Sequence, residues 1–122
     1  MSRSELMCIM SDKTSGNLLN DPSVASSGES FENLLVRDGV RLERIVSRGQ
    51  ASPAGFWFDQ PQDEWVAVLS GAADLHFEDE AEPRRLIAGD FVLIEAHRRH
   101  RVAWTMPGAD TVWLALHIDP RP

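Results

Sequence analysis

The chain has 122 residues, 43% of them hydrophobic, which is enough for one domain with a buried core and too few for two. Twelve Lys and Arg against nineteen Asp and Glu give a formal net charge of -7, so we expect no binding to nucleic acid or to anionic membrane surfaces. Cys8 is the only cysteine, and no apolar run is long enough for a signal-peptide core or a membrane span, so we expect a cytoplasmic protein without an intrachain disulfide.

Residues 1–30 are expected to form a flexible N-terminal tail. Ser, Asn, Asp and Gly dominate from Ser11 to Ser30, and the apolar residues there follow no period. Residues 31–122 are expected to form a single domain. At its start, the segment 31–35 fits either a short helical turn or a first edge strand, and the sequence does not choose between them.

Short apolar runs separated by turn signals follow from residue 40 onward. Runs of this length with hairpin-length connections are typical of antiparallel β-sheet proteins, and no segment keeps a helical period. Closing such a sheet removes its exposed edges, which favours a barrel or jelly roll. The predicted strands cover residues 40–46, 55–60, 64–69, 72–78, 84–87, 91–94, 100–104 and 111–118.

Two histidines lie within predicted strands and are interpreted as structural or surface residues. His76 shares the polar face of the strand 72–78, so we expect it at the surface. His117 lies opposite the aliphatic face of the last strand, so we expect a structural role for it. The aliphatic face of that strand carries Val112, Leu114, Leu116 and Ile118, and the other face carries Trp113, Ala115 and His117.

Two segments resemble the signature motifs of the cupin superfamily. The first is EWVAVLSG, from Glu64 to Gly71, and the second is GDFVLI, from Gly89 to Ile94, followed by His100. The resemblance covers about residues 40–118. It implies an all-β, antiparallel double-stranded β-helix, that is, a jelly-roll barrel. It also implies a small-molecule pocket inside the barrel and a homodimer.

The resemblance also implies a possible metal site, with a first motif that is degenerate. Metal-binding relatives carry a His-x-His pair four or five residues before the Glu, and both histidines are replaced here. In one register the pair falls on Phe58 and Gln60, which Pro61 favours; in the other it falls on Trp57 and Asp59. The favoured register predicts that Gln60, Glu64 and His100 hold a divalent Fe, Mn, Ni or Zn ion. The alternative is a buried Glu64–His100 pair that needs no metal.

Further pocket residues follow from the same alignment. We expect Phe58, His97 and Trp104 to line the pocket, where the aromatic rings would favour a flat or apolar ligand over a sugar phosphate. The basic run around His100 contains Arg98, Arg99 and Arg101. These arginines either bind an anionic group of a substrate or pair with nearby carboxylates.

Three functions are compatible with these residues. The first is a metal-dependent enzyme of the dioxygenase, isomerase or lyase type that acts on a small organic molecule. The second is a metal-free protein that binds or senses a small molecule without catalysis. The third is a dimeric interaction module, for which the barrel is only a scaffold. The superfamily hosts all three, so the fold alone does not choose among them.

Overall fold

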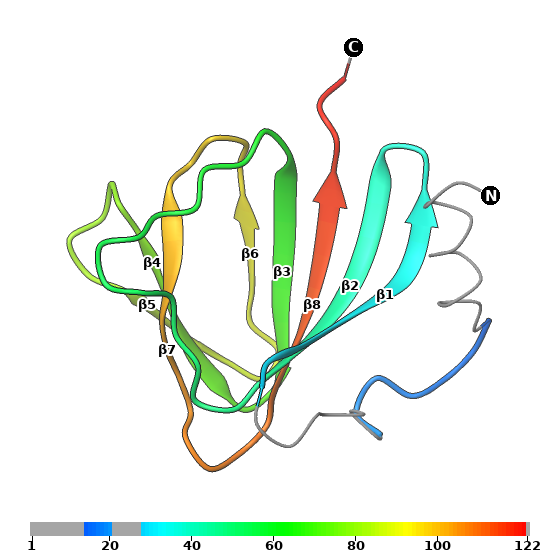
Figure 1. The fold of residues 1–122 in the computed structure, drawn as a ribbon, viewed down its shortest axis with the longest axis horizontal. Coiled ribbons are helices and arrows are strands. Elements are labelled where there is room, and N and C mark those ends of the chain that lie inside the picture. Colours follow the sequence, from blue (N-terminus) through cyan, green and yellow to red (C-terminus); the bar gives the residue numbers. More distant parts are fainter. Residues whose placement is uncertain (1–13, 21–27, 122) are drawn as a thin grey trace.

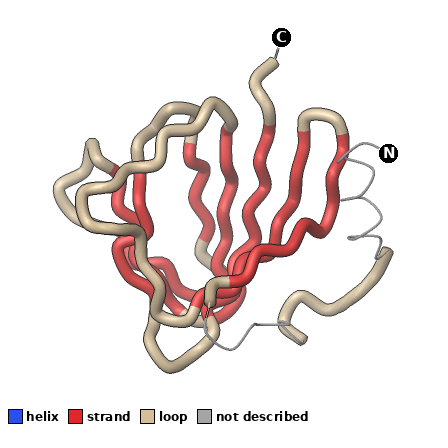
Figure 2. Tube along the Cα trace, in the orientation of Figure 1, coloured by secondary structure: helices blue, strands red, loops and turns tan. Residues whose placement is uncertain are grey.

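The computed structural model describes residues 14–20 and 28–121, which form two antiparallel sheets (Figure 1). The described residues consist of strands, turns and loops, with no helix among them (Figure 2). Accordingly, no helix in these ranges is long and apolar enough to cross a membrane. The strands are β1 (Ser30–Arg37), β2 (Val40–Ser47), β3 (Asp63–Ser70), β4 (Ala72–Phe77), β5 (Arg84–Ile87), β6 (Phe91–Ile94), β7 (His100–Thr105) and β8 (Thr111–Ile118).

The two sheets differ in size and lie on opposite sides of the molecule (Figure 1). The larger has the order β1-β2-β8-β3-β6, and the smaller has the order β5-β4-β7. Inward side chains of both sheets form the core, which includes Val66 and Val68 from β3, Leu75 and Phe77 from β4, and Trp113 from β8. The all-β, antiparallel architecture expected from the sequence is therefore confirmed.

The chain passes from one sheet to the other at Gly71, between β3 and β4. Gly71 has φ +84, a left-handed conformation that residues with a side chain rarely adopt. The Thr111 hydroxyl lies against the turn, with Oγ1 3.2 Å from the Ala72 carbonyl oxygen and 3.3 Å from the Ala72 amide nitrogen. A Cβ placed on Gly71 would lie 2.4 Å from that hydroxyl oxygen, so the turn has no room for a side chain.

The prediction of a strand at 55–60 is wrong, although the other predicted strands are present. The segment from Ser52 to Gln60 forms an irregular loop whose one ladder contact is a bridge between Phe58 and His100. Pro53 and Pro61 bracket the segment, and Gly55 turns the chain with φ +77. Proline lacks an amide donor, so a regular ladder does not extend through either end. The segment at 31–35, left open by the sequence, belongs to strand β1.

The face of β8 that points inward is the one that carries His117. Trp113 and Ala115 are buried on it, and His117 is 8% exposed, whereas Leu114 and Leu116 are only half-buried on the outer face. His117 does lie opposite the aliphatic face, as the alternation predicts, but the aliphatic face is the outer one and the face of His117 is the inner one. The outer face of the large sheet is also apolar: Phe91 is 65% exposed and stacks on Trp65. Aliphatic character alone does not distinguish the two faces.

Two arginines of the basic run, Arg98 and Arg99, pair with carboxylates. Arg98 bonds to Asp79 and Glu80 and lies 3.6 Å above the ring of Phe77, while Arg99 pairs with Glu78. Hydrogen bonds from Arg98 to Asp79 and from Arg84 to Glu80 hold the pKa values of both carboxyls below their usual 3.8 and 4.5.

Stability is expected to depend on pH through this cluster. Because both carboxyl pKa values are lowered on folding, their contribution is present above 4.5 and is lost as the pH falls through the lowered values. We expect Arg98→Gln to lower the melting temperature at neutral pH and to differ less from the wild type below pH 3.8. Thermal denaturation across this range measures the effect, with Arg37→Gln as the control. A pH-independent difference would contradict the assignment.

Candidate functional site

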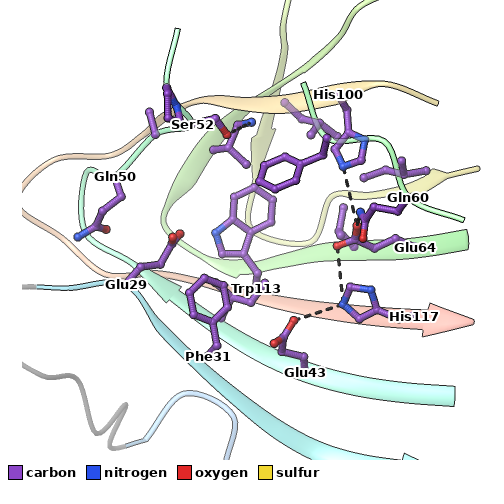
Figure 3. A pocket seen from close by; sticks show the side chains of 18 residues that line it. Glu29, Phe31, Glu43, Gln50, Ser52, Gln60, Glu64, His100, Trp113 and His117 are labelled. Carbon is purple, nitrogen blue, oxygen red and sulfur yellow. Dashed lines mark hydrogen bonds and ion pairs between the residues drawn. The ribbon is translucent and has the colours of Figure 1, made fainter. Parts of the chain in front are cut away.

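A cavity of about 360 Å³ lies between the two sheets. Its walls come from all five strands of the large sheet, from β4 and β7 of the small sheet, from the loop at 50–60, and from Glu29, just before β1 (Figure 3). The walls combine apolar side chains, such as Val66, Ile94 and Val102, with a few polar ones. A concave, largely apolar space with a small number of converging polar groups is typical of a small-molecule site.

The loop at 50–60 brings Phe58 and Gln60, among other residues, to the cavity without forming a strand. Backbone hydrogen bonds join Phe58 and His100 in both directions, at 2.7 and 3.1 Å, and a third bond of 2.7 Å joins the amide of His97 to the carbonyl of Gln60. Phe58 and Gln60 both line the cavity. The other register is not adopted, because Asp59 is exposed and bonds to His97 outside the cavity.

Glu64 is the central polar group of the cavity wall. Glu64 is the second residue of strand β3 and is buried, with 9% of the residue exposed. Gln60 Nε2 donates to Glu64 Oε1 over 2.9 Å, and His100 Nε2 lies 3.9 Å from the same oxygen. The structure thus brings together the three residues that the sequence singled out. His100 also stacks against the ring of Phe58.

His117 completes the polar group, and the sequence analysis missed it. Glu64 and His117 are directly opposite each other in the β3–β8 ladder. His117 Nε2 lies 4.0 Å from Glu64 Oε2 and 3.3 Å from Glu43 Oε1. The result is a chain in the order His100, Glu64, His117, Glu43, with the carboxylate of Glu64 between two imidazoles (Figure 3). We call it the His–Glu chain.

The contacts of the two histidines determine their neutral tautomers. His100 Nδ1 lies 2.8 Å from the carbonyl oxygen of Arg98, which only accepts, so Nδ1 carries the proton and Nε2 presents a lone pair toward Glu64. His117 Nε2 faces two carboxylates, so in this ring Nε2 carries the proton. His117 Nδ1 is buried and has no hydrogen-bond partner among the residues that the structure describes. The two imidazoles therefore present opposite chemistry to Glu64, one an acceptor and the other a donor.

The donor set does not fit a metal ion held in the manner of metal-binding relatives. The ring of Phe58 takes one of the two histidine positions, and Gln60 turns an N–H donor toward Glu64. The imidazoles of His100 and His117 approach different oxygens of Glu64. Within residues 14–20 and 28–121, no three His, Cys, Asp or Glu side chains are placed to hold one ion. The metal set of Gln60, Glu64 and His100 stays a prediction from the sequence.

Two other residues expected in the pocket lie elsewhere. His97 is at the surface, where its Nδ1 lies 2.7 Å from Asp59 Oδ1. Trp104 packs beneath the guanidinium of Arg85, on the small sheet and away from the cavity lining. Arg101 bonds to the backbone carbonyl of Ser52 and does not line the cavity.

Comparison with solved structures identifies relatives of this fold. A protein from Ralstonia eutropha JMP134, provisionally named a mannose-6-phosphate isomerase, is 52% identical, covering 88% of this chain and 100% of its own, with a TM-score of 0.84. The polyketide cyclase RemF from Streptomyces resistomycificus is 19% identical over 79% of this chain and 68% of its own, with a TM-score of 0.65. An RmlC-like cupin with a double-stranded β-helix fold from Methanocaldococcus jannaschii is 17% identical over 78% and 84%, with a TM-score of 0.63.

The similarity to RemF and to the Methanocaldococcus protein shows a shared fold, whereas the Ralstonia protein is similar in sequence as well. No curated protein sequence matches the chain. A family model described as a cupin domain matches residues 45–117, a span that contains Glu64, His100 and His117. The expected family and fold are thus confirmed: the chain belongs to the cupin family.

Proposed function

We propose that this cupin is an enzyme that moves protons on a small organic molecule, of the isomerase or lyase type, with Glu64 as its central acid–base group. The observation that supports this most strongly is the His–Glu chain on the cavity wall. A buried carboxylate with His100 Nε2 at 3.9 Å and His117 Nε2 at 4.0 Å places a base beside two groups that can carry a proton. A carboxylate and a histidine at one cavity form the usual apparatus of general acid–base catalysis.

The proposed reaction uses groups of the protein alone. Glu64 takes a proton from a carbon next to a carbonyl group, and the electron pair of the broken C–H bond shifts to leave negative charge on the carbonyl oxygen. A protonated His100 Nε2 donates its proton to that oxygen. Where the first carbon carries a hydroxyl group, Glu64 then returns its proton to the former carbonyl carbon while that hydroxyl gives its proton back to His100. The carbonyl group thereby moves by one carbon, which completes an isomerisation with no oxidant and no net change of charge. His117, held by Glu43, positions Glu64.

The provisional isomerase name of the Ralstonia relative is compatible with this chemistry, and a carbonyl compound is the substrate class that it suggests. A metal-dependent reaction at Gln60, Glu64 and His100 and simple binding without catalysis are the competing functions. The homodimer expected from the resemblance stays a prediction, as does a cytoplasmic location.

Deuterium exchange tests the proposal on several candidate substrates at once. Protein in D₂O is incubated with a panel of small carbonyl compounds, including mannose 6-phosphate, and NMR measures deuterium entering their carbon positions. We expect exchange in the presence of a chelator, and we expect Glu64→Gln to lower its rate by about 10²–10⁴-fold, because the amide cannot accept the proton. His117→Gln should lower the rate less, since His117 only positions Glu64.

Glu78→Gln is the matched control, because Glu78 pairs with Arg99 at the surface. Exchange that stops with chelator and returns with a divalent ion would replace the proposal with the metal-dependent enzyme. A panel compound that binds saturably but exchanges nothing would favour the binding protein instead. Equal rates for Glu64→Gln and the wild type would reject Glu64 as the acid–base group.

A further inference from the structure

The charges around the cavity are unusual for a protein that would bind a phosphorylated or carboxylated molecule. Three carboxylates line the cavity, those of Glu29, Glu43 and Glu64, and no Arg or Lys of the described residues does. Arg41 approaches Glu43 Oε2 at 3.1 Å, so one of the three charges is compensated from outside the lining. Within the described ranges, Glu29 makes no ion pair; its Oε2 accepts a 2.6 Å hydrogen bond from the hydroxyl of Ser47.

Aromatic side chains lie beside these carboxylates. Phe31 and Phe58 are 60% and 41% exposed, and both line the cavity, so their rings stand where a ligand would contact them. Trp113 lies deeper, and its indole projects into the space between Glu29 and the His–Glu chain (Figure 3). Aromatic faces attract cations, most strongly when the cation is partly desolvated.

Among the described residues, Trp113 also supplies a polar atom without a partner. The residue is 4% exposed, and its indole Nε1–H is buried with no hydrogen-bond acceptor in the ranges 14–20 and 28–121. An unpaired buried donor costs about 1–3 kcal/mol, so a ligand whose acceptor reaches this group as the surrounding side chains adjust gains affinity. The cavity wall therefore favours a ligand with a positively charged group near the carboxylates and a neutral hydrogen-bond acceptor near the indole N–H.

We propose that the ligand of this cavity is a small ammonium-bearing compound with a neutral carbonyl or hydroxyl group, rather than a phosphorylated or carboxylated one. Its ammonium group lies near Glu29 against the aromatic rings, and its carbonyl reaches toward Trp113 and Glu64. A phosphate in the same place would meet carboxylates and, among the described residues, no lining Arg or Lys. This inference deepens the proposed function, because it names the substrate class of the same cavity.

Three probes of matched shape and different charge test the inference: phenethylamine, 2-phenylethanol and 3-phenylpropionate. Binding to the full chain is measured by calorimetry and by the shift of the Trp113 indole N–H signal in NMR. We expect phenethylamine to bind about tenfold or more tightly than 3-phenylpropionate, with 2-phenylethanol between them, because like charges repel across a partly desolvated site. Mannose 6-phosphate, included as a fourth probe, should not bind.

The variant Glu29→Gln keeps the shape of the side chain and removes its charge. We expect it to reduce the preference for phenethylamine over 2-phenylethanol several-fold, while Glu78→Gln leaves that preference unchanged. Tighter binding of 3-phenylpropionate or mannose 6-phosphate, equal binding of all probes, or no saturable binding of phenethylamine at millimolar concentration would overturn the inference. Phenethylamine binding without any deuterium exchange in the carbonyl panel would reject the proposed reaction and leave the inference standing.

Discussion

Replacing Gly71 with Ala is expected to lower the free energy of unfolding by about 3 kcal/mol. Two effects add. The left-handed φ of +84 costs a residue with a Cβ roughly 1–2 kcal/mol. The new methyl group would also lie 2.7 Å from Thr111 Cα and 2.8 Å from the Asp110 carbonyl oxygen, and such overpacking costs about 1–3 kcal/mol. Urea denaturation followed by tryptophan fluorescence measures the loss.

Gly39→Ala separates the two effects. Gly39 has nearly the same φ, +76, but no atom of the described part of the chain lies within 4 Å of the position that its Cβ would take. We therefore expect Gly39→Ala to lose only the conformational part, about 1 kcal/mol. Equal losses of unfolding free energy for the two variants would show that the close approach of Thr111 to the turn does not exclude a side chain at position 71.

Phe77→Ala is expected to lower the free energy of unfolding by about 3–5 kcal/mol, the usual range for a fully buried aromatic side chain. Phe77 is 0% exposed and packs in the core between the sheets. Arg98 and Arg84 cover its ring at 3.6 and 4.9 Å, so the deletion also removes two cation–π contacts. The same urea titration measures this loss, and an unchanged slope would show that the unfolding transition itself is preserved.

Phe91→Ala provides the comparison for Phe77→Ala. Phe91 is 65% exposed on the outer face of β6, where it stacks on the ring of Trp65. We expect its loss to cost less than about 1 kcal/mol. A cost for Phe91→Ala similar to that for Phe77→Ala would indicate that the outer face of the large sheet is covered in solution.

The fold could be predicted from local pattern because strand length and turn chemistry are local properties. Segments 84–87, 91–94 and 111–118 coincide with β5, β6 and β8 for this reason. The strand predicted at 55–60 was wrong because Phe56, Trp57 and Phe58 have high strand propensity, while the prolines on either side prevent regular pairing with a neighbouring strand. Strand propensity is a property of single residues and does not indicate whether a neighbouring strand is available for pairing.

The site was only partly predictable for a different reason. Glu64 and His100 lie in recognisable motifs, but the proximity of Glu64 to His117 depends on the register of β3 against β8. Glu43 enters through the next ladder, between β2 and β8. These pairings join residues more than fifty positions apart, and the alternating pattern of one strand does not fix them. The inward face of β8 was also ambiguous because both of its faces are apolar.

The loop at 50–60 has a consequence for how this cavity can change in evolution. Backbone groups at Ser52, Phe58 and Gln60 make the bonds that hold the loop in place, and these bonds do not depend on which side chains the residues carry. Because the loop stands outside the strand ladders, its side chains can be exchanged with little effect on the two sheets. The backbone course of the loop and the side chains that it presents to the cavity can therefore change independently. A lineage can replace the groups that face the ligand one at a time, and each intermediate sequence still folds around the same cavity.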